Sequence, residues 1–238
     1  MTLTLDPGLR KGAQQRQPRA LLIEPDRLRM VIGGIGVLLP FLLVAAAWLR
    51  PTKDLDVFLH SLSSYYYTSG IAVLEGTLFT LALFLLVYRG YPNKYKWADE
   101  WAARLAAGAA LVIALFPTYP PEKVPPPLWW REEFGMVHDW ASVVMFLMFA
   151  LFALWLFRKT DAGMQDLPRG KQWRNRVYLV CGLTIVGSTL WIAFLLKTGH
   201  TDILVPEAFA IAGFAVAFLV KGGAARRWMP SDGEVRTA

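Results

Sequence analysis

Histidine and acidic residues at the ends of apolar segments are the parts of this sequence that could do chemistry. His138 is followed directly by Asp139, and His200 lies seven residues before Glu207. Imidazole and carboxylate groups are the usual ligands of zinc and related divalent ions, which typically have three protein ligands at catalytic centres. Residue type therefore suggests a metal site of His138, Asp139 and His200. The sequence has no H-x-x-x-H or H-E-x-x-H spacing, and the alternative is that these histidines are ordinary residues of the membrane interface.

Two glutamates fall inside apolar runs rather than at their ends. Glu75 and Glu207 each lie thirteen residues before the end of a run, at Tyr88 and Val220. A carboxylate in the apolar part of a bilayer costs on the order of 2.5–3.5 kcal/mol, so it usually faces the interior of a bundle and has a partner. We expect both glutamates to point inward. The alternative to a functional role is a protonated glutamate that is hydrogen-bonded between helices.

The elements that position these residues are six long apolar runs. They are Met30–Leu49, Ser69–Tyr88, Ala102–Pro117, Met136–Phe157, Val177–Leu196 and Ile203–Val220. At about 1.5 Å per helical residue, each run is long enough, or nearly so, to cross a hydrocarbon core of roughly 30 Å. The sequence therefore predicts an all-α protein, a bundle of six transmembrane helices in a lipid bilayer.

Basic residues predict the orientation of this bundle. The N-terminal tail, the second loop, the fourth loop and the C-terminal tail contain six, three, six and four Lys and Arg residues, whereas the other three loops together contain five. By the positive-inside rule both termini are cytoplasmic, as an even number of spans also requires. We expect a cytoplasmic tail at 1–28, a membrane domain at 29–221 and a second tail at 222–238. Topology accounts for the net charge of +7, so no nucleic-acid partner is expected.

Small and bulky residues predict how the runs pack. The third run is rich in alanine, and the sixth spaces Gly213 and Ala217 four residues apart. Small residues let helix backbones approach closely, so we expect these two runs inside the bundle. The fourth run contains Phe146, Phe149 and Phe152, and we expect its cytoplasmic half to face lipid.

A resemblance is carried by several short motifs. They are Ser61–Leu62–Ser63–Ser64–Tyr65–Tyr66–Tyr67–Thr68 (S-x-S-x-Y-Y-Y-T), Tyr88–Arg89–Gly90–Tyr91, Ala114–Leu115–Phe116–Pro117, His138, Arg158–Lys159–Thr160, Arg174–Asn175–Arg176–Val177–Tyr178 and Cys181–Gly182. Together they resemble a family of uncharacterised bacterial multi-pass membrane proteins, over roughly residues 50 to 190. The resemblance implies the bacterial plasma (inner) membrane and no established activity. The chain departs from the pattern after the tyrosines, where its first acid is Glu75.

A more distant similarity is to the CREST membrane hydrolases and receptors. That resemblance implies a serine, an aspartate and three histidines around a zinc ion, for which the candidates are Ser61 or Ser63, Asp139, His60, His138 and His200. The CREST group has seven spans and a paired H-x-x-x-H, whereas the residue four positions after His200 is Leu204.

These observations predict a polar pocket at the extracytoplasmic face. Its predicted ligand-binding residues are Glu75, His138, Asp139, His200, Glu207, Ser63 and Tyr66. We expect the pocket between the fourth and sixth runs, roofed by the proline-rich loop and the tyrosines, where it suits a lipid or another amphiphile. The alternative function is that of a metal-dependent membrane hydrolase that acts on such a molecule, and the sequence leaves both open, along with the oligomeric state.

Overall fold

The computed structural model describes residues 24–53, 55–90, 94–122, 124–159 and 167–224. Most of the two predicted tails lies outside the described residues. Within them the chain is helical, with six α-helices and two short 3₁₀ segments. The predicted all-α class is therefore confirmed.

Each predicted apolar run coincides with one helix. The α-helices are α1 Pro25–Leu49, α2 Ile71–Leu86, α3 Lys96–Leu115, α4 Glu132–Leu154, α5 Arg169–Lys197 and α6 Leu204–Lys221; the 3₁₀ segments are η2 Ser63–Tyr67 and η3 Leu156–Arg158. Pro25 begins α1 and Pro168 precedes α5, positions where the missing N–H of proline costs nothing.

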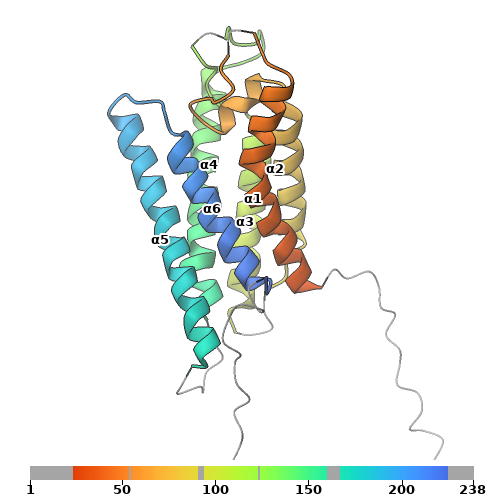
Figure 1. The fold of residues 1–238 in the computed structure, drawn as a ribbon, viewed down its shortest axis with the longest axis vertical. Helices are drawn as coiled ribbons and strands as arrows, with labels where there is room; N and C mark the ends of the chain where they lie inside the picture. Colours follow the sequence, from red (N-terminus) through yellow and green to blue (C-terminus); the bar gives the residue numbers. More distant parts are fainter. Residues whose placement is uncertain (1–23, 54, 91–93, 123, 160–166, 225–238) are drawn as a thin grey trace, which may run out of the picture.

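The six helices form a closed ring in the order of the sequence. Each helix contacts the next one along the chain, and α6 returns to contact α1. Figure 1 shows the helices running side by side along the long axis, with η2 at the upper end. We call this upper end the η2 end.

Small residues of α3 and α6 lie at contacts with the neighbouring helices, but both helices are members of the ring, and neither is enclosed by the other described helices as was predicted. Eight alanines of α3 are buried, and Gly213 of α6 is buried against α5. A Cβ atom at Gly213 would lie 2.9 Å from the backbone oxygen of Cys181. A side chain at this position would push α5 and α6 apart.

The prediction that the aromatic half of α4 faces lipid was wrong. Phe149 and Phe152 are 2% and 0% exposed. Phe149 stacks on Phe214 of α6 with ring centroids 3.7 Å apart, and Phe152 meets Phe218 edge-on at 5.3 Å. The large rings of α4 fill the space that small residues on the neighbouring helices leave.

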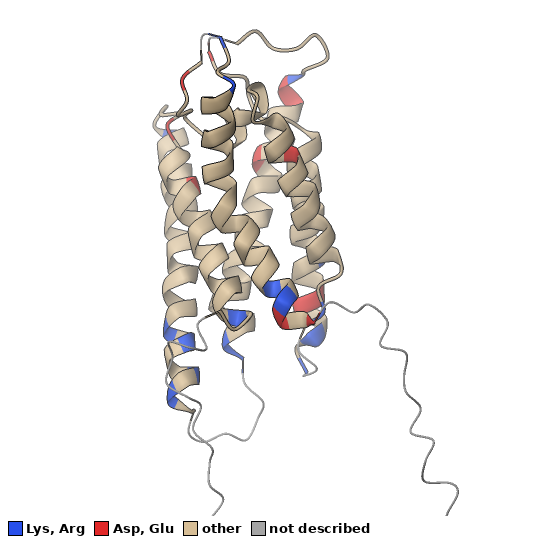
Figure 2. Cartoon of the chain, turned by 45° about the vertical axis from the view of Figure 1, so that its right-hand side comes forward, with Lys and Arg blue, Asp and Glu red and all other residues tan. Residues whose placement is uncertain are grey.

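Basic residues concentrate at the end opposite η2, which we call the basic end (Figure 2). The side chain of Arg29 is 2% exposed and binds Asp26 at 2.9 Å. Lys171 of α5 and Lys221 of α6 both donate to the backbone oxygen of Phe157, at 3.1 and 3.2 Å. These contacts join α5 and α6 to the end of α4, where helix carbonyls favour positive charge.

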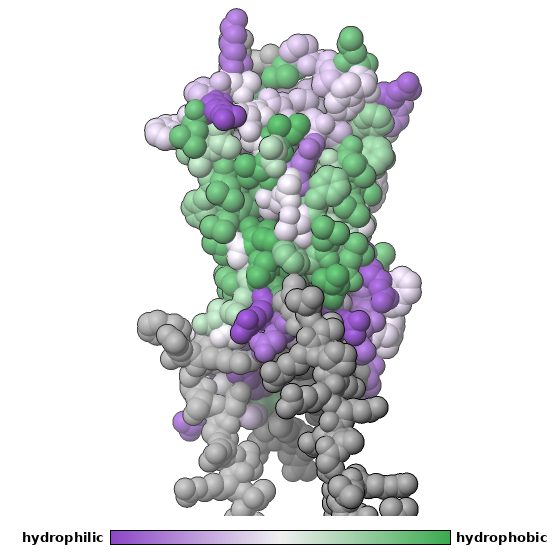
Figure 3. Space-filling model, turned by 90° about the vertical axis from the view of Figure 1, so that its right-hand side faces the viewer, coloured by the Kyte–Doolittle hydropathy of each residue, from purple (hydrophilic) through white to green (hydrophobic). Residues whose placement is uncertain are grey.

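A hydrophobic band lies between the two polar ends (Figure 3). Four described helices, namely α1, α4 with η3, α5 and α6, are long and apolar enough to cross a membrane, and α2 is apolar but shorter. A multi-pass membrane protein is therefore supported.

Candidate functional site

The segment around η2 reaches from the α1–α2 connection into the η2 end of the ring. The Leu62 N–H donates to Oε2 of Glu207 on α6 at 2.6 Å. The Tyr67 hydroxyl donates to the backbone oxygen of Thr118, between α3 and α4, also at 2.6 Å. The Tyr65 hydroxyl donates to the oxygen of Val57 at 2.7 Å. The tyrosines therefore anchor this segment to its neighbours.

The α5–α6 loop closes onto the same segment. The backbone N–H groups of Ile203 and Leu204 both donate to the oxygen of His60, at 2.8 and 2.7 Å. Residues on either side of η2 are thus fixed by α6 and by the loop that precedes it.

A cavity of about 260 Å³ lies beside η2, between α4, α5 and α6. One wall is polar, and the other is apolar and belongs mainly to α5. The lining residues are Ser61, Ser63, Thr118, His138, Asp139, Ser142, Val143, Phe146, Thr189, Leu190, Ile192, Ala193, Leu196, Ile203 and Glu207. We call this space the α4–α6 cavity.

The cavity exists because α5 loses its packing towards the η2 end. The buried residues of α5 end at Ser188, and the nine residues that follow in this helix are partly or fully exposed. Closer to the basic end, Gly182 and Gly213 hold α5 tightly against α4 and α6. The helix therefore packs over one half of its length and leaves an opening over the other.

A serine and a histidine form a hydrogen-bonded pair in the polar wall. Nε2 of His138 lies 2.9 Å from Oγ of Ser63, and Nδ1 lies 2.7 Å from the backbone oxygen of Phe116. A carbonyl oxygen can only accept, so Nδ1 carries the proton and Nε2 accepts from the Ser63 hydroxyl. His138 is 3% exposed, whereas Ser63 is partly exposed to the cavity.

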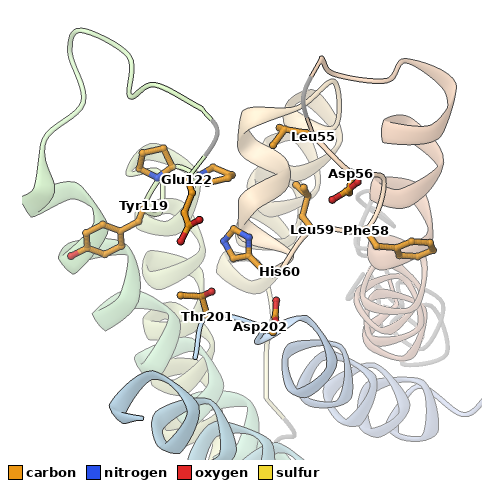
Figure 4. Close-up of a pocket in the computed structure, with 11 residues that line it drawn as sticks. Leu55, Asp56, Phe58, Leu59, His60, Tyr119, Glu122, Thr201 and Asp202 are labelled. Atoms are coloured by element: carbon orange, nitrogen blue, oxygen red, sulfur yellow. The ribbon is translucent and has the colours of Figure 1, made fainter. Parts of the chain in front are cut away.

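A second cavity, of about 380 Å³, opens at the η2 end (Figure 4). We call it the vestibule, and it is lined by Leu55, Asp56, Phe58, Leu59, His60, Tyr119, Pro120, Pro121, Glu122, Thr201 and Asp202. Figure 4 shows His60 near its centre, with Glu122 and Asp202 around it. Nε2 of His60 lies 2.9 Å from Oγ of Ser64, which is 0% exposed.

The two cavities are neighbours. Three segments each place one residue in the vestibule and the next or preceding one in the α4–α6 cavity, namely His60 and Ser61, Tyr119 and Thr118, and Asp202 and Ile203. The partition is therefore thin, and the hydrogen bonds to the His60 oxygen run through it.

Two tyrosines near the η2 end, Tyr66 and Tyr119, have raised pKa values. Burial raises the pKa of the Tyr66 phenol, and the charge of Glu75 adds to the increase. Burial also raises the pKa of Tyr119, and the charges of Asp139 and Glu132 add to it. Acidic side chains therefore lie close enough to both phenols to disfavour their charged forms.

Comparison with known proteins places the chain in a family. The model of a family described as a protein of unknown function, DUF998, matches residues 34–221, which cover the ring from α1 to α6. The chain belongs to the DUF998 family. No curated protein and no solved structure gives a significant match to it.

Four of the seven predicted ligand-binding residues of this DUF998 protein come together. Ser63, His138, Asp139 and Glu207 line the α4–α6 cavity. Glu75 and Tyr66 do not line it, although the charge of Glu75 acts on Tyr66.

His200 also lies outside the α4–α6 cavity. It is exposed, and its Nδ1 lies 3.1 Å from the Thr198 hydroxyl. The cause is local, because α5 continues to Lys197 and Gly199 then reverses the chain with φ of 79°. A positive φ favours glycine, and the turn leaves His200 on the surface.

The arrangement does not fit the expected zinc ion. Among the described residues, no three His, Cys, Asp or Glu side chains are grouped so that they could hold a metal. Both ring nitrogens of His138 already have hydrogen-bond partners, and a metal would need the lone pair that Ser63 occupies.

The sequence analysis missed three hydroxyl-bearing residues that line the α4–α6 cavity, Thr118, Ser142 and Thr189. Ser142 had a signal, because it follows His138 by four residues and therefore lies on the same face of α4. Thr118 sits in a loop, and no periodicity places it.

Proposed function

We propose that this DUF998 protein binds an amphiphile with a neutral or positively charged head group in the α4–α6 cavity. The observation that carries the proposal is the pairing of a polar wall with an apolar wall in one space that opens beside an incompletely packed helix. A head group would contact the hydroxyls, and a hydrocarbon chain would lie along α5.

The size of the cavity supports a ligand that is only partly enclosed. Its volume of about 260 Å³ lies just below the range of roughly 300–1,000 Å³ that is common for small-molecule sites. The head group and the first part of a chain fit this space. The rest of the chain would continue between α5 and the surrounding lipid.

The charges around the cavity support the choice of head group. Its described lining contains Asp139 and Glu207 but no Lys or Arg. The neighbouring vestibule adds Asp56, Glu122 and Asp202. An anionic head group would find no cationic partner in this described lining and would be repelled by the acids of the vestibule, whereas an ammonium group would be attracted and a neutral polar one could use the hydroxyls.

We further propose that all six helices span the bacterial plasma membrane with both termini in the cytoplasm. The closed ring supports this, because α2 and α3 lie between the longer spans α1 and α4. The 16 residues of α2 reach about 24 Å at about 1.5 Å per residue, a mismatch that local thinning of the bilayer absorbs. The concentration of Lys and Arg at the basic end supports the orientation, and the cavity would then open on the extracytoplasmic side.

Binding is tested with three amphiphiles that have a twelve-carbon chain and no carboxylic ester bond: dodecyltrimethylammonium, the dodecyl ether of glycerol, and dodecyl phosphate. Native mass spectrometry of the purified protein measures their affinities. We expect the cationic and neutral compounds to bind at least tenfold more tightly than the phosphate, because the described lining offers no Lys or Arg and the neighbouring vestibule is acidic.

Two tryptophan variants of α5 locate the binding site. Ala193→Trp fills the cavity, and we expect it to weaken binding at least tenfold. Leu183→Trp is the matched control, since Leu183 lies on the same helix, is 57% exposed and does not line the cavity. Equal affinities of the two variants, or tightest binding of the phosphate, would rule the proposal out.

Topology is tested with single cysteines in a Cys181→Ser background. Cysteines at Lys53, Glu122 or Thr201 should react with an impermeant thiol reagent on intact cells, and a cysteine at Arg169 should react only after lysis. Reaction of Arg169→Cys on intact cells would reverse the orientation.

A further inference from the structure

We propose that Ser63 is a nucleophile, with His138 as its general base, and that the pair cleaves a carboxylic ester in an amphiphile bound in the α4–α6 cavity. This inference rests on the proposed binding function and adds a reaction to it. It requires a correctly protonated histidine, access of the serine to the ligand, a bond that suits the charges of the site, and a supply of water.

The hydrogen bonds of His138 fix the proton where such a pair needs it. Because Nδ1 donates to the Phe116 oxygen at 2.7 Å, Nε2 is left with a lone pair directed at the Ser63 hydroxyl, 2.9 Å away. A histidine within hydrogen-bond reach of the hydroxyl and oriented by a third group is the arrangement that activates serine nucleophiles. Phe116 supplies that third group with its backbone oxygen, so it is a positioning residue.

Access to the cavity separates Ser63 from the adjacent Ser64. Ser63 is partly exposed and lines the cavity together with His138. Ser64 lines neither cavity and is 0% exposed. A ligand whose chain lies along α5 would therefore present its head-group linkage to Ser63.

The residues that line the cavity indicate which kind of bond the pair would cleave. Phosphoryl transfer depends on cations that stabilise the charge of the phosphoryl oxygens, and the described lining of the cavity offers acids instead. Attack on a carboxylic ester creates a single oxyanion, which hydroxyl donors can stabilise. Thr118 and Ser142 place two hydroxyl groups in the same lining.

The reaction runs in two balanced steps. The Ser63 oxygen attacks the carbonyl carbon while its proton moves to Nε2 of His138; the bond to the alcohol then breaks, and the alcohol leaves with that proton. Water next attacks the acylated Ser63 and gives one proton to Nε2. The carboxylic acid leaves, and the proton returns to the Ser63 oxygen. One ester and one water thus become one acid and one alcohol.

The vestibule supplies the water. It is open and polar, and three segments of the chain border both it and the cavity. Water could therefore approach Ser63 from the head-group side, while the chain of the ligand stays on the side of α5.

The test uses an alkyl fluorophosphonate, which modifies activated serines, and an alkyl phosphonate diester of equal chain length that cannot react. Intact-mass measurement of the purified full-length protein should show one adduct, and peptide mapping should place it on Ser63. We expect Ser63→Ala to abolish the adduct and His138→Gln to slow its formation at least 100-fold. Ser64→Ala, the matched control, should be modified at the rate of the unaltered protein.

The non-reactive diester separates the two proposals. If the diester binds but no adduct forms, or if the adduct maps to another residue, the nucleophile is wrong and the binding function stands. If neither compound binds, both proposals fail. Because mapping is done on the unaltered protein, a variant that does not fold leaves the result intact.

Discussion

Two adjacent serines each pair with a different histidine at the same distance, yet the two pairs have different surroundings. Ser63 is 2.9 Å from His138, and Ser64 is 2.9 Å from His60. The first pair borders a cavity with an apolar wall. In the second pair the serine is enclosed, and the histidine faces a polar vestibule. Hydrogen-bond length therefore does not identify a reactive serine, whereas access and the orientation of the ring do.

Substitution of the two histidines tests most directly whether the two pairs differ in function. We expect His138→Gln to lower the hydrolysis rate of p-nitrophenyl laurate by about 10²–10⁴-fold, the usual contribution of a general base. His60→Gln should change the rate by less than about threefold, since His60 does not border the ligand. The rate is measured as p-nitrophenolate release by protein in lipid nanodiscs. Equal losses in the two variants would mean that the pairs do not differ in role.

Glu207 tests whether the position of η2 matters to the first pair. Its carboxylate accepts the Leu62 N–H, so Glu207→Leu should let the segment move and lower the same rate by about 10- to 100-fold, as expected for a displacement on the order of 1 Å. Glu207→Gln keeps an acceptor oxygen and should lose much less. If the leucine variant keeps full activity, this hydrogen bond does not position Ser63.

The stability of the folded protein should depend more on Ser64 than on Ser63, which is the reverse of the order expected for hydrolysis. Ser64→Ala removes a fully buried hydroxyl and its hydrogen bond to Nε2 of His60, and we expect it to lower the free energy of unfolding by about 1 kcal/mol. Ser63→Ala should cost less, because water from the cavity can replace the lost hydroxyl. Chemical denaturation of the two variants in one detergent gives the difference. A larger loss for Ser63→Ala would contradict the assignment of access.

The smallest expected effect concerns the tyrosine that anchors the segment carrying both serines. Burial raises the pKa of the Tyr67 phenol above its usual 10.0, and Tyr66 adds to the increase. The neutral phenol is favoured in the folded state, so its contribution to stability is complete below pH 10.0 and is lost as the pH rises through the higher folded value. Tyr67→Phe should flatten the decline of the melting temperature above pH 10.0. An unchanged slope would show that other groups cause the decline.

The sequence predicted the six helices well because the length of an apolar run is a strong signal. It did not predict which face of α4 turns inward, since lipid and protein interior are equally apolar and hydropathy cannot tell them apart. Packing of Phe149 on Phe214 decides that orientation, and such a contact is visible only in three dimensions.

Part of the candidate site could be predicted, namely the residues whose positions follow from the helices. Counting along the runs matched Glu75 with Glu207 in depth, and residue type added His138; Glu207 and His138 line one cavity, whereas Glu75 does not. The position of His200 depended on a single turn at Gly199. The 3₁₀ segment η2 has no periodic pattern, because its shape comes from hydrogen bonds to residues far along the chain, such as Glu207.

The hydrogen bond between Leu62 and Glu207 also determines when the site can assemble during translation. The two residues are 145 positions apart, which at roughly 5–20 residues per second corresponds to about 7–30 s of translation. During that interval the nascent chain already contains Ser63 but has no acceptor for Leu62 and no backbone donors for His60. Ser63 therefore reaches its final geometry only when the last helix joins the ring, so a chain that stalls before α6 exposes no assembled site to the lipids around it.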